Sequence, residues 1–289
     1  MNVLRKYVLL ATDTKQTLGG RTLYRIRALV EIGETVAAGD LGGYVETEDN
    51  LSHDGLAWMS GDARVYGNAS VSGNARVSGN AHVSGHARVF GDALVFGDAR
   101  VFGDALVSGN ASVGGNARVC GNASVYGNAL VYGEARVYGN ADVFGIALVF
   151  GIALVSGNAR VCGNASVCGD ARVFGDALVY GNAHVFGNAH VSGDARITGN
   201  SYVHGNALVY GTNIVATRSD GYTFLVAPTP EGPRILAGCR YFTFEEAEAH
   251  WTKTRGGTQL GDESLALVCH LRRMAELNGF MAPIAETAA

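Results

Sequence analysis

The segment GDARVYGNASVSGNARVS, residues 61–78, consists of three hexads with one shared pattern. In each hexad Gly comes first, Asn or Asp second, Ala third and Val fifth, while the fourth and sixth residues vary. The register of this pattern continues without a gap from Gly55 to Ala216, which makes 27 hexads. The third residue departs from Ala only at Ser201 and Asn213. An uninterrupted repeat of this kind predicts a repeat architecture.

Each hexad combines a strand signal with a corner signal. Ala and Val alternate with variable residues, which indicates a short strand with one buried face. The Gly-Asn or Gly-Asp pair tolerates left-handed backbone angles and marks a corner. The glycines, 41 in a chain with only 4 prolines, are therefore interpreted as corners of a β-solenoid, whose coils hydrogen-bond to one another and leave free edges only at the ends.

The sixth residue of the hexads indicates how many of them make one coil. Large and small residues at this position switch in blocks of about three, so that residues 18 apart usually differ in size, as Tyr66/Ser84 and Phe174/Ser192 do. Stacked strands lie only ~4.8 Å apart, so a ring above a small side chain packs better than two rings. We expect a triangular prism with 18 residues per coil and about nine coils.

The unit Val-x-Gly-Asn-Ala-x resembles the hexapeptide-repeat left-handed β-helix family. The resemblance implies an all-β, left-handed parallel β-helix, because the period alone does not give the hand. A right-handed triangular helix of the bactofilin type is the alternative. Trimers are common in the family, and its acyltransferases bind acetyl-CoA between the prisms of a trimer.

The two ends of the chain lack the hexad repeat. Residues 1–54 predict an N-terminal β cap, with strands at Lys6–Thr12 and Leu23–Ile32 around a turn at Leu18. Residues 55–216 form the β-helix in this division. Residues 217–289 predict a small α+β capping module. Its expected elements are a hairpin of Tyr222–Ala227 and Arg234–Ala237, a helix from the Thr243/Glu246 capping box to Lys253, a loop over Thr254–Gly261, and a helix from Asp262 or Ser264 to Asn278.

The N-terminal segment carries a second resemblance. Gly39-Asp40-Leu41-Gly42-Gly43-Tyr44 and Asn50-Leu51-Ser52 look like uncharacterised, acetyltransferase-like hexapeptide proteins of enteric bacteria and their phages. This resemblance covers the cap and the repeats and transfers no catalytic residue. It implies a bacterial or phage origin.

Composition limits the class of protein. With 47% hydrophobic and 17% charged residues the chain is not of the disordered type. The longest apolar runs are too short to span a membrane, and a formal net charge of −4 argues against nucleic acid as a partner. Cys120, Cys162 and Cys168 occupy small sixth positions and are expected to be reduced, in a cytoplasmic protein, rather than metal ligands. No metal site is predicted.

The fourth residues on one face of the prism form a basic ladder, which could bind an anion. Acids two residues earlier, such as Asp98 before Arg100, are expected to compensate this charge. The candidate anion-binding residues are Arg64, Arg100, Arg118, Arg136 and Arg172.

One coil breaks the pattern. Ile replaces Asn or Asp at two successive corners, and the sixth position has large residues above large ones. Contiguous exposed apolar surface usually marks an interface, so we expect self-association here, as a homotrimer or, second, a dimer. The candidate interface residues are Leu94, Leu130, Phe144, Ile146, Leu148, Phe150, Ile152 and Leu154.

Catalysis receives little support from the sequence. Acyltransferases of this fold use a His as general base, often near a loop that interrupts the repeats, and no loop interrupts these 27 hexads. No catalytic residue is assigned, and the weak candidates are His82, His86, His184 and His190. The leading hypothesis is a non-catalytic β-helical scaffold or interaction protein without a cofactor. The alternatives are an acetyl-CoA-dependent acyltransferase and a phage factor that binds a host protein or a small anionic ligand.

Overall fold

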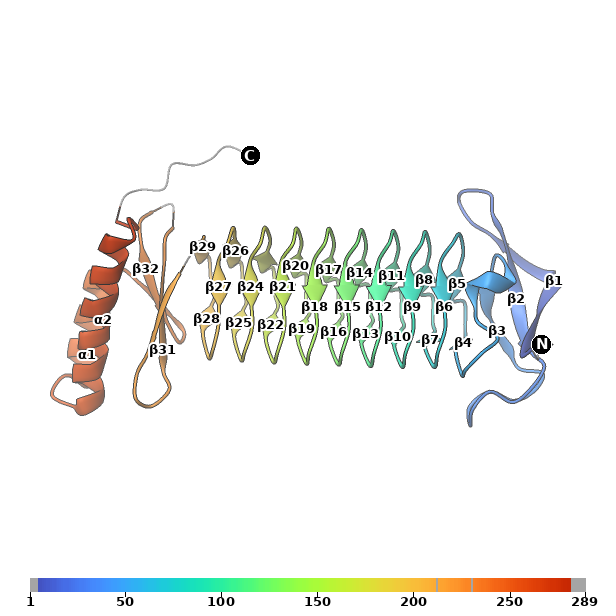
Figure 1. Ribbon diagram of the computed structural model, residues 1–289, viewed down its shortest axis with the longest axis horizontal. Coiled ribbons are helices and arrows are strands. Elements are labelled where there is room, and N and C mark those ends of the chain that lie inside the picture. The colour runs from blue at the N-terminus through green and yellow to red at the C-terminus, as the bar shows by residue number, and fades with distance from the viewer. Residues whose placement is uncertain (1–4, 212, 230, 282–289) are drawn as a thin grey trace. The chain divides into compact units, whose positions relative to one another are not determined.

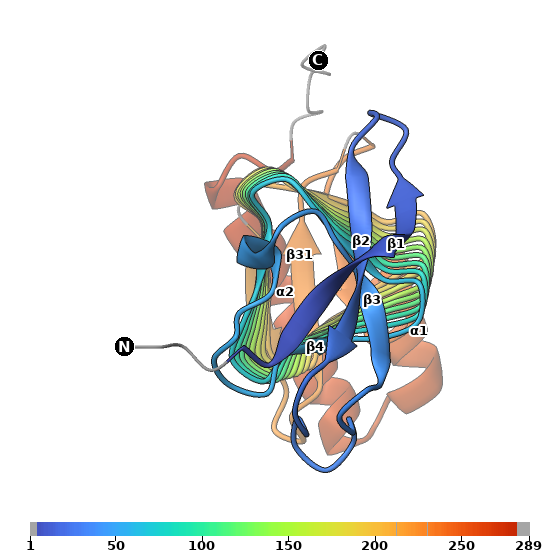
Figure 2. The same ribbon diagram turned by 90° about the vertical axis from the view of Figure 1, so that its right-hand side faces the viewer.

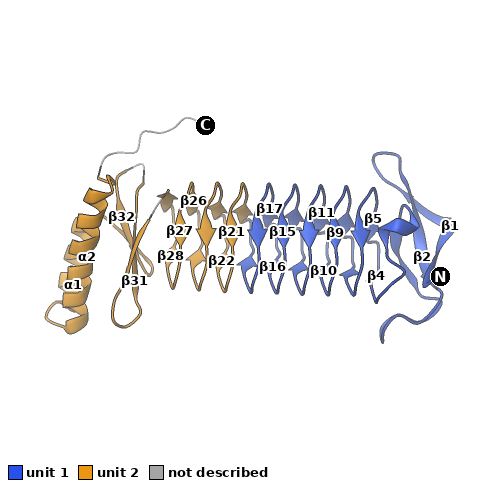
Figure 3. Cartoon of the chain, viewed as in Figure 1, with its two compact units in different colours: residues 1–152 blue, residues 153–289 orange. Residues whose placement is uncertain are grey.

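The computed structural model describes residues 5–211, 213–229 and 231–281. The chain divides into two compact units, residues 1–152 and residues 153–289, which Figure 3 colours separately. Solenoid strands occur in both units (Figure 1).

The first unit begins with a three-stranded cap. β1 (Tyr7–Gln16) and β2 (Thr22–Ala28) form the expected hairpin, and β2 pairs antiparallel with β3 (Leu41–Val45). β3 then pairs in parallel with the first strand of one solenoid face, with Tyr44 opposite Arg64. Figure 2 shows this cap across the end of the unit's coils. The cap thus covers the open strand edge that a solenoid would otherwise present.

The two distinctive segments of the cap have structural roles. A Cβ on Gly43 would lie 2.6 Å from the carbonyl oxygen of Ala63, so only Gly allows β3 to lie against the first coil. Asn50, in the short 3₁₀ helix Glu48–Asn50, is 1% exposed, and its amide donates to the carbonyls of Gly67 (3.0 Å) and Ala69 (2.8 Å). These residues fasten the cap to the first coil.

The solenoid strands of the first unit are short and follow one another at each hexad. Every strand pairs in parallel with the third strand after it, as β5 does with β8, so three hexads make one coil, as predicted. The strands are β4 (Trp58–Met59), β5 (Arg64–Val65), β6 (Ser70–Val71), β7 (Arg76–Val77), β8 (His82–Val83), β9 (Arg88–Val89), β10 (Leu94–Val95), β11 (Arg100–Val101), β12 (Leu106–Val107), β13 (Ser112–Val113), β14 (Arg118–Val119), β15 (Ser124–Val125), β16 (Leu130–Val131), β17 (Arg136–Val137), β18 (Asp142–Val143) and β19 (Leu148–Val149).

Three faces result from this pairing. The arginine face of the first unit contains β5, β8, β11, β14 and β17, and continues β3. The leucine face contains β4, β7, β10, β13, β16 and β19, and the third face contains β6, β9, β12, β15 and β18. The lattice Ala and Val side chains point inward from all three faces, and nearly all are 0% exposed. The hydrophobic core of the unit is therefore the axis of the coil.

The second unit repeats this architecture and adds an α+β module. Its solenoid strands fall into three parallel ladders, β20-β23-β26-β29, β22-β25-β28 and β21-β24-β27. They are β20 (Leu154–Val155), β21 (Arg160–Val161), β22 (Ser166–Val167), β23 (Arg172–Val173), β24 (Leu178–Val179), β25 (His184–Val185), β26 (His190–Ser192), β27 (Arg196–Ile197), β28 (Tyr202–Val203) and β29 (Leu208–Tyr210).

The lattice ends one hexad earlier than the sequence suggested. Counted along the chain, the 26 strands from β4 to β29 correspond to about nine coils at three strands per coil. The last hexad instead supplies β30 (Ile214–Thr217), which pairs antiparallel with β31 (Thr223–Ala227). Asn213 stands where other hexads have Ala, and its side-chain oxygen accepts from the backbone N–H of Arg196 at 2.6 Å. A side chain therefore completes the last coil.

The module that follows has four strands and two helices. β31 pairs with β32 (Arg234–Ala237) as expected, and β33 (Arg240–Phe242), which the sequence did not indicate, extends the sheet. α1 (Phe244–Arg255) begins at the predicted Thr243/Glu246 capping box. The apolar core between the sheet and the helices consists of Phe224, Val226, Ile235, Ala237, Phe244, Ala247, Trp251, Val268, Leu271 and Ala275.

The second helix differs from expectation at its start. α2 spans Gln259–Leu277, so the helix begins inside the loop predicted over 254–261. Its N-cap is Thr258, whose hydroxyl accepts from the N–H of Gly261 at 3.1 Å. Gly261 weakened the helix signal, but the structure needs Gly there because a Cβ would collide with the carbonyl of Arg255. No helix in the described ranges is both long and apolar enough to cross a membrane.

Candidate functional site

The leucine face of the first unit carries a row of exposed apolar side chains. Leu94, Ser112, Leu130 and Leu148 are successive partners in one parallel ladder. Leu94 and Leu130 are 39% and 40% exposed. The structure therefore places three of the predicted interface residues, Leu94, Leu130 and Leu148, in one line.

The corners beside this row are polar except at its end. Asn side chains on adjacent coils hydrogen-bond along the corner, as Asn110 does to Asn128 at 2.9 Å. In the final coil of the unit Ile146 takes the next corner position, and Ile152 takes the corner on the other side of β19. They are 63% and 58% exposed. The sequence did not predict these amide ladders.

The aromatic residues near these corners stack. Tyr126 and Phe144 lie with ring centroids 4.9 Å apart, and Tyr132 and Phe150 lie 5.5 Å apart, both nearly parallel. Two rings on adjacent coils are therefore accommodated, because the ladder spacing of ~4.8 Å suits offset stacking. The expected ring-above-small arrangement holds at Phe96, whose ring occupies the space of a Cβ on Gly114. The eighth predicted interface residue, Leu154, belongs to the second unit, where it lies opposite Arg172.

A groove of about 580 Å³ lies at the other end of the leucine face. The loop between β2 and β3 forms one wall with Ile32, Thr35, Val36 and Asp40, next to Leu41 at the start of β3. The face itself supplies the rest, namely Leu56, Trp58, Arg76, Leu94 and Phe96 with Ser60 and Ser78. Leu41, Leu56 and Phe96 are 54%, 45% and 42% exposed. Exposed apolar side chains thus occur at both ends of this face, with Arg76 and Ser112 among them in the ladder.

The arginine face holds the predicted basic ladder. Arg64, His82, Arg100, Arg118 and Arg136 are successive ladder partners. Arg172 lies in the second unit, opposite His190. Within the described ranges no ion pair joins these arginines to the acid two residues earlier.

The acids of the corners have other partners. Asp62 pairs with Lys15 of the cap at 2.6 Å, and the Lys15 ammonium, through its hydrogen bond, lowers the pKa of the Asp62 carboxyl. Asp98 accepts a hydrogen bond from Asn80 at 3.0 Å. We expected these carboxylates to pair with the arginines two residues later. In the structure they instead contact a lysine of the cap and an amide of the neighbouring corner.

A basic pocket of about 290 Å³ lies where the β1–β2 turn meets the arginine face. The turn supplies Thr17, Leu18, Gly19 and Arg21, and the face supplies Arg64, Tyr66, His82 and Arg100. The sequence identified the arginines but not the pocket, since the turn is remote from them along the chain. The pairing of Tyr44 with Arg64, which joins the cap to this face, was not visible in the repeat pattern.

The candidate histidines are dispersed. His82 is half-buried in the basic pocket, and burial together with Arg64 and Arg100 lowers its pKa below 6.5. His86 is exposed at a corner near Asn68. In the second unit His184 stacks on Tyr202 with 5.0 Å between ring centroids. His190 meets the ring of Phe174 edge-on, and burial, with Arg172, lowers its pKa. The structure brings His82 to cationic partners and does not bring these four histidines to one site.

The cysteines and the possible metal ligands show no reactive or binding arrangement. All five cysteines are free, and burial raises the pKa of Cys120, Cys162 and Cys168, which disfavours a thiolate at neutral pH. The part of the chain that the structure describes contains no group of three or more His, Cys, Asp or Glu arranged to hold a metal ion.

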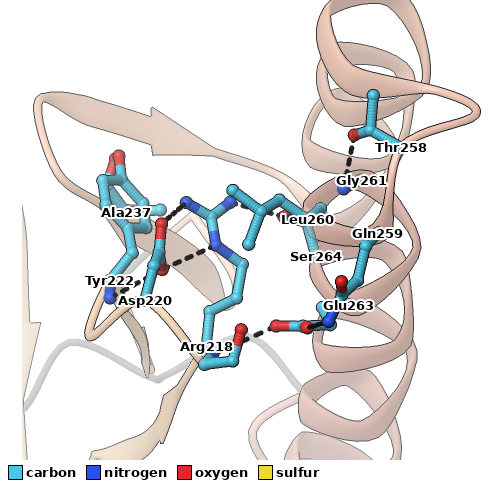
Figure 4. Close-up of polar contacts among 11 residues, drawn as sticks. Arg218, Asp220, Tyr222, Ala237, Thr258, Gln259, Leu260, Gly261, Glu263 and Ser264 are labelled. Carbon is cyan, nitrogen blue, oxygen red and sulfur yellow. Dashed lines mark hydrogen bonds and ion pairs between the residues drawn. The ribbon is translucent and has the colours of Figure 1, made fainter.

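A buried arginine organises the module of the second unit (Figure 4). Arg218, 4% exposed, donates to both carboxylate oxygens of Asp220 at 2.9 and 2.7 Å and to the Ser264 hydroxyl at 2.8 Å. Its guanidinium also lies 4.8 Å from the ring centroid of Tyr222 and 5.6 Å from that of Trp251. Because Ser264 lies on α2 and Asp220 in the turn between β30 and β31, these hydrogen bonds link α2 to that turn.

This link predicts an acid-sensitive module. The hydrogen bond from Arg218 holds the pKa of Asp220 at about 2, below its ordinary 3.8. A carboxyl with a depressed pKa stabilises the fold above its unfolded pKa, and this stabilisation is lost as pH falls from about 4 to 2. Near-UV circular dichroism of the Tyr222/Trp251 environment during acid titration should follow this loss. In Asp220→Asn the same signal should lose this part of its pH dependence, and an unchanged profile would contradict the assignment.

Comparison with known proteins supports the repeat architecture. Residues 69–85, 99–115 and 117–133 each match a family model described as the YdcK beta solenoid repeat. Each matched segment is close to one coil in length, so the match and the pairing of the strands agree that the chain is a β-solenoid repeat protein. None of the curated proteins compared with the chain gave a significant match. The resemblance to acetyltransferase-like proteins of enteric bacteria and phages stays a prediction, as does the left hand of the coil.

Proposed function

We propose that the protein is a non-catalytic scaffold that associates with copies of itself through the leucine face of the first unit. The supporting observation is the line of Leu94, Leu130 and Leu148, which ends between the exposed Ile146 and Ile152. Exposed apolar surface of this extent is typical of an interface. In this function no cofactor takes part.

A second copy is the proposed partner because outward side chains recur at a constant spacing on this face, one from each coil. Along the ladder the outward residues are Leu94, Ser112, Leu130 and Leu148, and the neighbouring column contains Phe96, Gly114, Tyr132 and Phe150. Large and small residues thus lie at steps of ~4.8 Å. Large residues of a second copy can pack against Ser112 and Gly114, the small residues of this face. A trimer is the first expected assembly and a dimer the second.

Restoring the corner residues tests this proposal. We expect the wild-type chain to sediment with two or three times its monomer mass of 30.1 kDa, and the double variant Ile146→Asn with Ile152→Asn to sediment as a monomer. The fold should persist, because Asn is the ordinary residue at these corners and hydrogen-bonds to its neighbour there. Circular dichroism on heating checks that the coils remain intact.

A matched control distinguishes the leucine face from general loss of apolar surface. Leu106 is a half-buried, outward-facing leucine on the third face of the same unit. Leu106→Asn should leave the sedimenting mass unchanged. A wild-type chain that sediments as a monomer at ~100 μM, a concentration that would populate any complex of micromolar affinity, would refute self-association. Equal dissociation by Leu106→Asn would refute the choice of face.

A further inference from the structure

The arginines of the basic pocket beneath the β1–β2 turn differ in whether they have an ion-pair partner. Arg21 in its wall is already paired, since its Nη1 lies 2.9 Å from each carboxylate oxygen of Glu46. Glu46 is also held by the N–H of Gly67 at 2.7 Å. Arg64 and Arg100, in contrast, have no ion-pair partner among the described residues, and no acidic residue belongs to the pocket lining. The guanidinium groups of Arg64 and Arg100 are thus free of ion pairs, and Asp62 and Asp98 act on this region only at longer range.

One buried donor in the pocket is unused. The Nε of Arg64 is buried and has no hydrogen-bond partner among the described groups. A buried polar group without a partner is costly, and an N–H of a guanidinium is best satisfied by an anionic oxygen. Arg64 and Arg100 flank His82 in the ladder, so their backbones lie about 9.6 Å apart at two steps of ~4.8 Å. An oxyanion between two guanidinium groups bridges such a span.

The pocket also offers two side chains for apolar contact, Leu18 and Tyr66. Leu18, at the tip of the β1–β2 turn, is fully exposed, and Tyr66 is half-buried beside Arg64. Figure 2 shows the hairpin projecting across the coils. A fully exposed leucine at the lip of a cationic cavity provides contact for an organic group attached to an anion.

We propose that this pocket binds a small phosphate monoester. Arg64 and Arg100 hold the phosphate oxygens, and Leu18 and Tyr66 contact the organic part. This site is independent of the proposed association through the leucine face, because its lining residues belong to the hairpin and the arginine face.

Titration with phenyl phosphate, followed by ³¹P NMR or calorimetry, tests the site. The full-length protein should bind phenyl phosphate saturably and more tightly than inorganic phosphate, since only the ester offers a ring to the apolar wall. Arg100→Gln should weaken binding roughly tenfold, the usual effect of losing one charge-assisted hydrogen bond. Leu18→Asp should lower the affinity for phenyl phosphate by a larger factor than the affinity for inorganic phosphate, because Leu18 contacts the organic group.

Arg136→Gln is the matched control. Arg136 occupies the same ladder two steps beyond Arg100 and is not part of the pocket. This variant should bind phenyl phosphate within about twofold of wild type, since only a screened, distant charge has gone. Equal weakening by Arg136→Gln and Arg100→Gln would overturn the pocket in favour of a diffuse basic surface. No saturable binding to the wild type, or equal affinity for phenyl phosphate, phenyl acetate and inorganic phosphate, would overturn the ligand class.

Sulfate provides a second readout, because its charge is constant between pH 5 and 8. The groups that act on His82 are Arg64 on β5 and Arg100 on β11, which with burial lower its pKa, and Asp98 before β11, which opposes them. From the hairpin, Arg21 faces the pocket with its charge matched by Glu46. Protonation of His82 adds a positive charge, so sulfate should bind several-fold more tightly at a pH low enough to protonate His82 than at pH 7.5. His82→Gln should abolish this difference, and its persistence in that variant would exclude His82 from the site.

Discussion

Replacing Gly157 with alanine is expected to destabilise the second unit by about 2–5 kcal/mol, the sum of left-handed backbone strain and crowding between coils. Gly157 has φ +68°, and a Cβ there would lie 2.9 Å from both the N and the O of Gly175 in the next coil. Backbone atoms cannot move aside as a side chain can. The shift should appear as a lower urea midpoint by far-UV circular dichroism and as faster amide exchange around β21 and β24.

A second glycine in the same unit separates the two causes. Gly205 has φ +64°, yet nothing lies within 4 Å of a Cβ placed on it. Gly205→Ala should therefore cost only the left-handed strain, about 1–2 kcal/mol. Equal midpoints for the two variants would show that the close stacking of corners contributes nothing, and would leave glycine at these positions explained by φ alone.

Truncating Arg218 to alanine is expected to destabilise the α+β module by about 2–4 kcal/mol, because the change removes a buried guanidinium and leaves its partners unpaired. Ser264 loses the donor at 2.8 Å, and the space against the Tyr222 and Trp251 rings becomes empty. Asp220 remains 38% accessible to water, which moderates the loss. Trp251 fluorescence during urea unfolding reports on this region directly.

Arg273 is the control for the arginine of the module. It pairs with Glu276 at 2.9 Å, but its side chain is 66% exposed. Arg273→Ala should change stability by less than about 1 kcal/mol, as exposed ion pairs do. If Arg218→Ala behaved like Arg273→Ala, the cluster of Figure 4 would not hold α2 to the sheet.

Much of the fold follows from local rules in the hexads. The alternation of large and small sixth residues predicts three hexads per coil, and the ladder pairing of Leu94 with Ser112 confirms it. Phe96 above Gly114 shows the underlying contact. The helix at Thr243 could be predicted because a capping box is a local signal. The predicted start of α2 is wrong because Gly261 is required by a contact with Arg255, which the sequence does not display.

The candidate surfaces also contain contacts that the sequence could predict and contacts that it could not. Leu94, Leu130 and Leu148 could be aligned from the sequence, since a constant coil length converts residue number into position. The pairing of Asp62 with Lys15 could not, because the acid and the base come from segments with no common period. The expected pairing of corner acids with ladder arginines therefore differs from the structure.

The sequence by itself determined the coil length, the inward Ala and Val positions, and the residues that share each face. These properties recur with every hexad and depend only on near neighbours. The tertiary structure alone decided where the cap lies on the first coil, and with it the pocket formed by Leu18, Arg64 and Arg100. That placement depends on contacts such as Gly43 against Ala63 and Asn50 with Gly67, which join residues outside the repeat to residues within it and follow no period.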